Sequence, residues 1–163
     1  MEKQKISACL WFDYQAVEAM NFYTSIFPNS KKGSITRYGE SASKSSGQKI
    51  GSVLTANFTL NGQEFMALNG GPIFKFTEAI SLVVHCKTQK EVDYYWKKLT
   101  RGGEESRCGW LKDKFGVSWQ IVPDGASKFW GGKNPEKSER AMKALLKMKK
   151  LDINALKHAY DGK

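Results

Sequence analysis

The chain has 163 residues, of which 40% are hydrophobic, and a formal net charge of +10. This length suits one domain or two small modules that share a core, and the hydrophobic content excludes a disordered chain. No apolar run approaches the roughly 20 residues of a membrane helix, and residues 1–5 lead into a strand-like segment without a signal peptide, so we expect a cytoplasmic protein with no membrane partner.

The first part of the chain combines strands with one helix. Apolar residues recur at three- and four-residue steps and predict a helix over residues 16–27. Residues 39–49 are rich in Ser, Gly and Lys and are expected to form a mobile loop. Asn61-Gly62 is a hairpin signal. The expected strands of this part are residues 6–12, 34–38, 51–60 and 63–68.

The same order then begins again at residue 80. Residues 80–86 form a strong predicted strand, and Val92, Tyr95, Trp96 and Leu99 give residues 89–99 an apolar helical face. Residues 113–116 predict a turn. The strands expected after this helix are residues 104–110, a short piece near 111, and residues 117–122.

After Pro123 the chain becomes helical and basic. Asn134 is a predicted N-cap with Pro135 in the first turn, and Asp152 is a predicted cap for a last helix through Tyr160. Residues 128–163 carry ten Lys and Arg against four Asp and Glu. Such a tail could touch nucleic acid, but no nucleic-acid motif accompanies it, so the solvated face of a Lys-rich helix is the favoured interpretation.

The restart indicates an internal duplication. A shift of 72 residues places Leu10 on Leu82 and Met20 on Val92, and a later shift of 54 places Phe65 on Trp119. Each copy reads βαβββ. We therefore predict an α+β fold with two tandem βαβββ modules, residues 1–76 and 77–125, that form one domain. The modules are expected to make a curved, mainly antiparallel eight-stranded sheet around a cavity, with residues 126–163 as a C-terminal helical appendage.

Five segments resemble the vicinal-oxygen-chelate superfamily, in particular its PhnB-like branch, which is often labelled as 3-demethylubiquinone-9 3-methyltransferase domains. They are residues 9–13 (CLWFD), 19–23 (AMNFY), 26–28 (IFP), 61–72 (NGQEFMALNGGP) and 108–123 (CGWLKDKFGVSWQIVP). The resemblance implies the duplicated fold and a homodimer. It does not imply one reaction, because the superfamily includes isomerases, dioxygenases, antibiotic-modifying enzymes and antibiotic-binding proteins.

Metal-dependent members of that superfamily hold a divalent ion with His and Glu. The resemblance places those positions at Ser7, Ala79, Gln120 and Met66, which are poor ligands for a transition metal. No GxGxxG turn follows any predicted strand, so the residues do not support binding of S-adenosylmethionine. We therefore expect neither a metal nor a cofactor. The three cysteines are widely spaced and are expected to be free, buried thiols.

Strand alternation instead gathers side chains that suit a small organic ligand with one or two polar groups. The alternative is that they only fill the interior of the sheet. Cys9 could be a reactive thiol or a small buried hydrophobe, and His85 could be a general base or a solvated strand-end histidine. The candidate ligand-binding residues are Ser7, Cys9, Trp11, Glu64, Met66, Asn69, His85, Trp110, Ser118 and Gln120.

Three functions follow from these patterns. The first is a protein that binds a small molecule without metal chemistry of its own. The second is an enzyme of the superfamily that uses Gln120, Glu64, His85 or a bound cofactor, in which Gln120→Ala would abolish turnover. The third is a basic interaction protein that acts through the tail and binds a polyanion with steep salt dependence.

Overall fold

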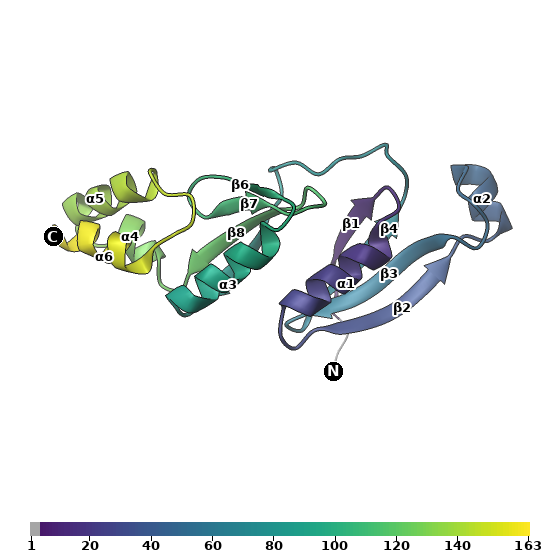
Figure 1. The fold of residues 1–163 in the computed structure, drawn as a ribbon, viewed down its shortest axis with the longest axis horizontal. Coiled ribbons are helices and arrows are strands. Elements are labelled where there is room, and N and C mark those ends of the chain that lie inside the picture. The colour runs from purple at the N-terminus through teal and green to yellow at the C-terminus, as the bar shows by residue number, and fades with distance from the viewer. Residues whose placement is uncertain (1–3) are drawn as a thin grey trace. The chain divides into compact units, whose positions relative to one another are not determined.

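A computed structural model of the chain describes residues 4–163 and divides into two compact units, one up to Lys75 and one from Phe76 to Lys163 (Figure 1). Residues 1–3, part of the segment in which no signal peptide is expected, lie outside the described residues. From residue 4 onward, no helix is long and apolar enough to span a bilayer.

The elements of the first unit are β1 (Ala8–Phe12), α1 (Ala16–Ile26), β2 (Lys31–Arg37), α2 (Glu40–Ser46), β3 (Val53–Leu60) and β4 (Gln63–Asn69). Those of the second unit are β5 (Leu82–Cys86), α3 (Gln89–Leu99), β6 (Glu104–Glu105), β7 (Trp110–Lys112), β8 (Ser118–Pro123), α4 (Ser127–Gly131), α5 (Pro135–Leu145) and α6 (Ile153–Asp161).

Both units contain the same mixed sheet. The strand order is β1-β4-β3-β2 in the first sheet and β5-β8-β7-β6 in the second. In each sheet the first and last strands of the module pair in parallel, and the other neighbours pair antiparallel. The tandem βαβββ prediction is confirmed, and its eight strands are divided between two hydrogen-bonded sheets of four. A single domain over residues 1–125 and a cavity shared by both modules stay predictions.

The two copies correspond at a slightly different spacing from the one that the sequence indicates. Phe12 and Cys86 end β1 and β5, and they pair with Asn69 and Pro123, which end β4 and β8. The equivalent positions of β1 and β5 are therefore two residues farther apart than the predicted 72. Because this difference is even, each strand residue keeps its predicted face. The counterpart of Ser7 becomes Ser81 instead of Ala79.

In the first unit, helix α1 covers one face of the sheet. The Tyr23 ring stacks on Phe58 with 6.0 Å between ring centroids, and Phe58 stacks on Phe65 at 5.4 Å. These rings are buried, whereas Cys9 and Met66, which point to the other face, are exposed. The first sheet thus has one packed face and one open face, as an alternating strand pattern predicts.

In the second unit, α3 covers the equivalent face. Thr88 caps this helix by accepting a hydrogen bond from the backbone N–H of Glu91 at 3.2 Å. The turn between β7 and β8 depends on Asp113, whose carboxylate accepts hydrogen bonds from Trp119 Nε1 at 2.8 Å and from the backbone N–H of Val117 at 3.1 Å. The predicted turn is therefore present, with a buried carboxylate at its centre. The core side chains from α3, β7 and β8 are Val92, Trp96, Leu99, Leu111, Trp119 and Ile121.

Two segments differ from the sequence-based expectation. The expected loop 39–49 contains helix α2, which ends at Gly47 in the left-handed conformation, with φ of 74°. The expected strand 104–110 is reduced to the short β6 followed by an irregular stretch. Cys108 and Gly109 both have positive φ, 57° and 83°, so regular pairing cannot continue through them.

The C-terminal helices pack within the second unit and share a small core of their own. Asn134 and Asp152 cap α5 and α6 as predicted, accepting hydrogen bonds from Lys137 N at 3.0 Å and Ala155 N at 2.8 Å. The buried residues of this core are Ala126, Phe129, Ala141, Leu145, Leu151 and Leu156.

Residues 148–153 tie this helical tail to the βαβββ part of the unit. The side-chain amide of Gln89 donates to Leu151 O at 3.1 Å and accepts from Ile153 N at 2.9 Å. The backbone N–H groups of Cys108 and Gly109 donate to the carbonyls of residues 148 and 149, both at 2.8 Å. The tail therefore supports the irregular stretch between β6 and β7.

Candidate functional site

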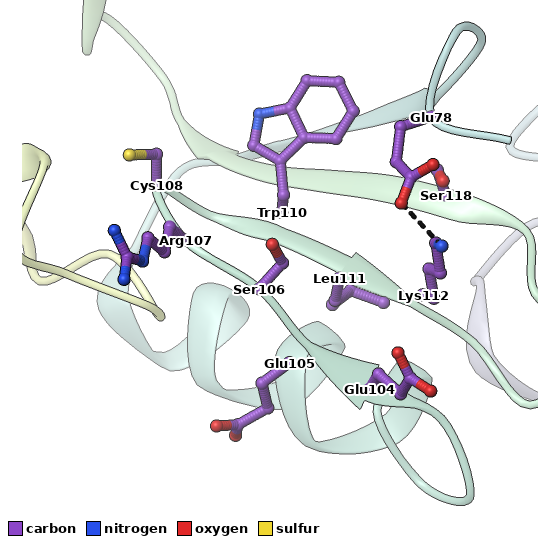
Figure 2. A pocket seen from close by; sticks show the side chains of 10 residues that line it. All are labelled: Glu78, Glu104, Glu105, Ser106, Arg107, Cys108, Trp110, Leu111, Lys112 and Ser118. Atoms are coloured by element: carbon purple, nitrogen blue, oxygen red, sulfur yellow. Dashed lines mark ion pairs between the residues drawn. The ribbon is translucent and has the colours of Figure 1, made fainter.

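The face of the second sheet opposite α3 carries a cavity of about 400 Å³ (Figure 2). Strands β7 and β8 place their side chains there in two cross-strand pairs, Trp110 with Gln120 and Lys112 with Ser118. Both pairs lie on one face because the residues are two positions apart on each strand. The cavity is lined by Glu78, Glu104, Glu105, Ser106, Arg107, Cys108, Trp110, Leu111, Lys112 and Ser118.

Ser118 is the most unusual residue of this lining. It is 2% exposed, and its hydroxyl oxygen has no hydrogen-bond partner among the described residues. A buried hydroxyl without a partner costs about 1–3 kcal/mol, so native proteins rarely keep one without a reason. Ser118 lines the cavity but its hydroxyl oxygen is covered, so a molecule in the cavity can supply the missing partner once a neighbouring side chain moves aside.

Lys112 and Glu78 form an ion pair at the same end of the cavity as Ser118 (Figure 2). Lys112 Nζ lies 2.6 Å from Glu78 Oε1. This hydrogen bond raises the pKa of the Lys112 ammonium and lowers the pKa of the Glu78 carboxyl, each relative to its ordinary value. Both groups are therefore charged at neutral pH. Glu104, which pairs with Lys112 across β6 and β7, adds a second nearby carboxylate.

The other end of the cavity is formed by the irregular stretch before β7. Arg107, Cys108 and Trp110 lie there (Figure 2), and the Cys108 thiol donates to Leu145 O at 3.7 Å. Gly109 has no room for a side chain, because a β-carbon would lie 2.8 Å from Ile121 O and 3.1 Å from a Leu151 side-chain carbon. Close contact with the tail and with β8 thus fixes this rim.

Glu105 contributes little charge to the cavity because two partners hold its carboxylate. Oε1 accepts a hydrogen bond from Trp96 Nε1 at 2.9 Å, and Oε2 lies 3.6 Å from Lys149 Nζ. Figure 2 shows this side chain turned toward α3, away from Lys112. The negative groups that remain for the cavity are Glu78 and Glu104.

Of the predicted site residues in the second module, the structure brings Trp110 and Ser118 into the cavity. Gln120 lies beside Trp110 and donates from Nε2 to Ser81 Oγ at 2.8 Å. His85 lies at the end of β5 with 70% of its side chain exposed, and its Nδ1 is 4.0 Å from Asp124 Oδ1. His85 is not among the residues that line the cavity, so it matches the solvated strand-end alternative.

Five predicted residues share the open face or edge of the first sheet: Ser7, Cys9, Trp11, Glu64 and Met66. Cys9 pairs with Met66 across β1 and β4. Trp11 is held in place, since its Nε1 donates to Gly71 O at 2.8 Å and its ring meets Phe74 edge-on at 4.9 Å. The expectation that every cysteine is buried is wrong for Cys9, which is exposed. Partial burial still raises the pKa of its thiol.

Asn69 belongs to the opposite, packed face of that sheet. It is 6% exposed, its Oδ1 accepts a hydrogen bond from Ala16 N at 2.8 Å, and its Nδ2 donates to Val53 O at 3.1 Å. Both polar atoms of the amide are therefore engaged in holding α1 and β3. Asn69 is therefore a structural residue of the first module.

The cavity residues Lys112, Arg107 and Glu78 are absent from the sequence-based prediction. Lys112 could have been found, because it follows Trp110 by two residues and must share its face. Arg107 and Glu78 lie outside regular strands, where alternation gives no signal.

The donor set of these sheets does not suit a metal ion. In residues 4–163, no three His, Cys, Asp or Glu side chains are grouped so that they could hold one. The residues at the positions that the family resemblance predicts for metal ligands are Ser7, Met66, Gln120 and Ser81 in place of Ala79, and Gln120 offers one neutral oxygen at most.

Comparison with known proteins assigns the family. A family model described as 3-demethylubiquinone-9 3-methyltransferase matches residues 4–122. The PhnB protein of Bacillus cereus, a candidate 3-demethylubiquinone-9 3-methyltransferase, is 44% identical, with 74% of this chain and 99% of that chain covered and a TM-score of 0.65. The chain is a PhnB-like member of the vicinal-oxygen-chelate superfamily. No curated protein matches the PhnB-like chain.

More distant structures share the fold of the PhnB-like chain. Protein PA1353 from Pseudomonas aeruginosa is 17% identical, with 74% of this chain and 98% of that chain covered and a TM-score of 0.59. The fosfomycin resistance protein FosX from Listeria monocytogenes, in complex with Mn(II) and sulfate, is 14% identical, with 78% and 95% covered and a TM-score of 0.52. The family match ends at residue 122, so helices α4–α6 lie outside it.

Proposed function

We propose that this PhnB-like protein binds a small organic molecule in the cavity of its second module. The observation that carries the proposal is that Ser118 lines the cavity and that its buried hydroxyl has no partner among residues 4–163. A cavity of about 400 Å³ lies within the range of small-molecule sites. Trp110 offers apolar area, while Ser118 and Lys112 offer directed hydrogen bonds, and this mixture is typical of such sites.

The open face of the first module carries residues that suit a ligand of the same kind, bound without a metal ion. Cys9, Trp11 and Met66 provide apolar and thioether surface there, and Glu64 and Ser7 provide polar atoms. These residues stay predicted ligand contacts of the first module. The proposal assigns no reaction, because no nucleophile with an adjacent base is formed by the residues that line the second-module cavity.

The experiment is a screen of small organic fragments against the isotopically labelled full chain, read by backbone amide chemical shifts. We expect hits that shift the amides of residues 106–112 and of Ser118. Trp110→Ala should weaken such hits about tenfold, since an aromatic contact contributes roughly 1 kcal/mol or more to binding. Tyr94→Ala, which removes an exposed aromatic ring from α3, should leave them unchanged. Hits confined to other surfaces, or none, would contradict the proposal.

Pairing of two chains remains part of the proposal. Strand β2 is the edge strand of its sheet and is exposed along all seven residues, so its outer edge could pair with another strand. Sedimentation velocity of the full chain tests this, with a dimer as the expected result and a monomer at all concentrations as the contrary one.

The basic tail gives little support to nucleic-acid binding. Lys143, Lys149 and Lys150 form ion pairs with carboxylates of the same unit, and Arg140 donates to the carbonyls of residues 159 and 160. Cations with partners in the fold contribute less to a polyanion site than free ones. A solvated, structural role for these lysines is therefore favoured.

A further inference from the structure

We propose that the ligand of the second-module cavity is an organic anion whose acidic group displaces the Glu78 carboxylate from Lys112 and accepts a hydrogen bond from Ser118. This inference rests on the proposed function, because it names the chemical class that the same cavity would select. It assigns Glu78 the role of an internal carboxylate that occupies the anion position when the cavity is empty.

Two hydrogen-bond donors lie side by side in the wall of the cavity. Lys112 and Ser118 are direct cross-strand partners on β7 and β8, and both line the cavity. Side chains in such a pair lie close enough to contact one group together. The ammonium of Lys112 has three N–H donors, and the Ser118 hydroxyl has one that no protein acceptor uses. A carboxylate or phosphate offers enough acceptors for both, and charge-assisted hydrogen bonds of this kind are strong ones.

Glu78 shows that an acidic group fits beside Lys112. Its Oε1 lies 2.6 Å from Lys112 Nζ, yet Ser118 Oγ still has no partner, so Glu78 satisfies only half of this donor pair. A free ligand is not limited by the backbone that carries Glu78. When Glu78 has moved away, it can therefore approach both donors, which gives the ligand an advantage over the internal carboxylate.

The Glu78 contact is also easy to exchange. Glu78 lies in a turn outside any helix or strand, and 62% of its side chain is exposed. Ion pairs between exposed side chains contribute little to stability, because water and salt screen them. Release of Glu78 therefore costs the fold little, and the carboxylate returns to water when it moves away.

The balance of charge in the lining agrees with an anionic ligand. With Glu105 held by Trp96 and Lys149, the remaining charged groups are Lys112, Arg107, Glu78 and Glu104. Once Glu78 leaves Lys112, the ammonium loses its direct partner. An incoming acidic group replaces that contact, whereas a cationic ligand would meet Lys112 with like charge.

The rest of the ligand is expected to be apolar. Trp110 lies two residues before Lys112 on the same face of β7 and is half-buried. A flat apolar body attached to the acidic group would lie against the Trp110 ring. A cavity of about 400 Å³ has room for a molecule with one or two rings. The chemical class is therefore an aromatic or alicyclic carboxylate, or an organic phosphate of similar size.

The test compares three probes on the full chain by amide chemical-shift titration: 2-naphthoate, its neutral analogue 2-naphthamide, and acetate. We expect 2-naphthoate to shift the amides of residues 106–112 and Ser118 and to bind about tenfold more tightly than 2-naphthamide, the effect of one charge-assisted contact. Acetate should shift the Lys112 and Ser118 amides only weakly, because it lacks the apolar body.

Two pairs of variants separate the specific contacts from general effects of charge and packing. Ser118→Ala should weaken 2-naphthoate about tenfold. Its control is Ser138→Ala, which removes the other buried hydroxyl without a partner, in α5. Glu78→Gln should tighten 2-naphthoate about threefold, because the competing carboxylate is gone while the charge change is small and screened. Its control is Glu139→Gln, which removes the same charge from an ion pair outside the cavity.

The outcomes distinguish this inference from the proposed function. If 2-naphthamide binds in the cavity as tightly as 2-naphthoate, or if Glu78→Gln weakens 2-naphthoate, the cavity binds small molecules but the anion inference is wrong. If neither naphthyl probe nor any fragment of the broader screen shifts the cavity amides, both proposals fail.

Discussion

Asn69, the last residue of β4, caps helix α1 at Ala16, the first residue of that helix and 53 positions earlier in the chain. Asn69 Oδ1 accepts a hydrogen bond from Ala16 N at 2.8 Å, while Gln15, which precedes the helix, makes no side-chain cap hydrogen bond. The amide Nδ2 donates to Val53 O at 3.1 Å, and the Asn69 carbonyl accepts from Tyr38 Oη. One side chain therefore joins α1, β3 and β4 of the first module.

Asn69→Ala is expected to destabilise the first module by about 2–3 kcal/mol. The reason is that the substitution leaves the Ala16 N–H and the Val53 carbonyl without partners near a buried position. Urea unfolding of the full chain measures the change as a lower transition midpoint for the first module.

Asn57→Ala serves as the control for Asn69→Ala, because Asn57 also lies in the first sheet and its amide reaches only exposed atoms of Ser34. This variant should change the unfolding free energy by less than about 1 kcal/mol. Equal effects of the two substitutions would show that Asn69 does not serve as the cap.

The fold could be predicted from the sequence because apolar residues recur at regular intervals along its strands and helices. The alternation of residues such as Cys9, Leu10 and Trp11 fixes which face of a strand is buried, and the repeat shows that the pattern occurs twice. Helix α2 could not be predicted in the same way. It has no buried residue, so no apolar stripe marks it, and Gly47 at its end signals a loop equally well.

The candidate site could be predicted only where it follows strand alternation. Trp110 and Ser118 lie on regular strands, where alternation indicates their face, whereas Glu78 reaches Lys112 from a turn with no periodic signal. Asn69 is also a candidate ligand-binding residue in the sequence, but the structure places it in a long-range contact with Ala16, and a single sequence carries no pattern for such a contact.

Ser118→Ala should leave the unfolding free energy of the second module unchanged or raise it by about 1 kcal/mol, since it removes a buried hydroxyl that has no partner. Ser138→Ala should behave in the same way. Ser52→Ala should lower the free energy of unfolding, because its hydroxyl donates to Lys49 O at 2.6 Å. Thermal and urea unfolding measure these signs, and a clear loss of stability in Ser118→Ala would mean that the hydroxyl has a partner in the folded protein.

Cys86 is expected to make stability fall at alkaline pH. Burial, followed by the nearby carboxylates of Glu91 and Asp124, raises the pKa of its thiol from an ordinary value of 9.0 to about 12. Between these values the unfolded chain loses the proton while the folded chain keeps it, so the free energy of unfolding decreases as pH rises.

Urea unfolding of the second module across this pH range tests the Cys86 prediction. In Cys86→Ala, this decrease of the free energy of unfolding with rising pH should be absent. In Cys108→Ala, which alters a half-buried thiol of the same unit, the decrease should remain. In the native protein, a thiol reagent should modify the exposed Cys9 well before Cys86. Identical slopes with and without Cys86 would contradict the assignment.

Gly109 and Gly116 offer a matched test of the rim that the tail supports. The φ angle is 83° at Gly109 and 85° at Gly116, so the backbone alone strains an Ala at either position, at a cost of about 1 kcal/mol. A β-carbon at Gly116 would meet nothing within 4 Å, whereas one at Gly109 would lie 2.8 Å from Ile121 O and 3.1 Å from Leu151. Gly109→Ala must therefore push the tail or β8 away from the cavity rim.

We expect Gly116→Ala to lose about 1 kcal/mol of stability and Gly109→Ala clearly more. Gly109→Ala should also shift the amides of Cys108 and Leu151, which Gly116→Ala should not. If the two variants lose the same stability, the tail does not pack against Gly109 closely enough to hold the rim.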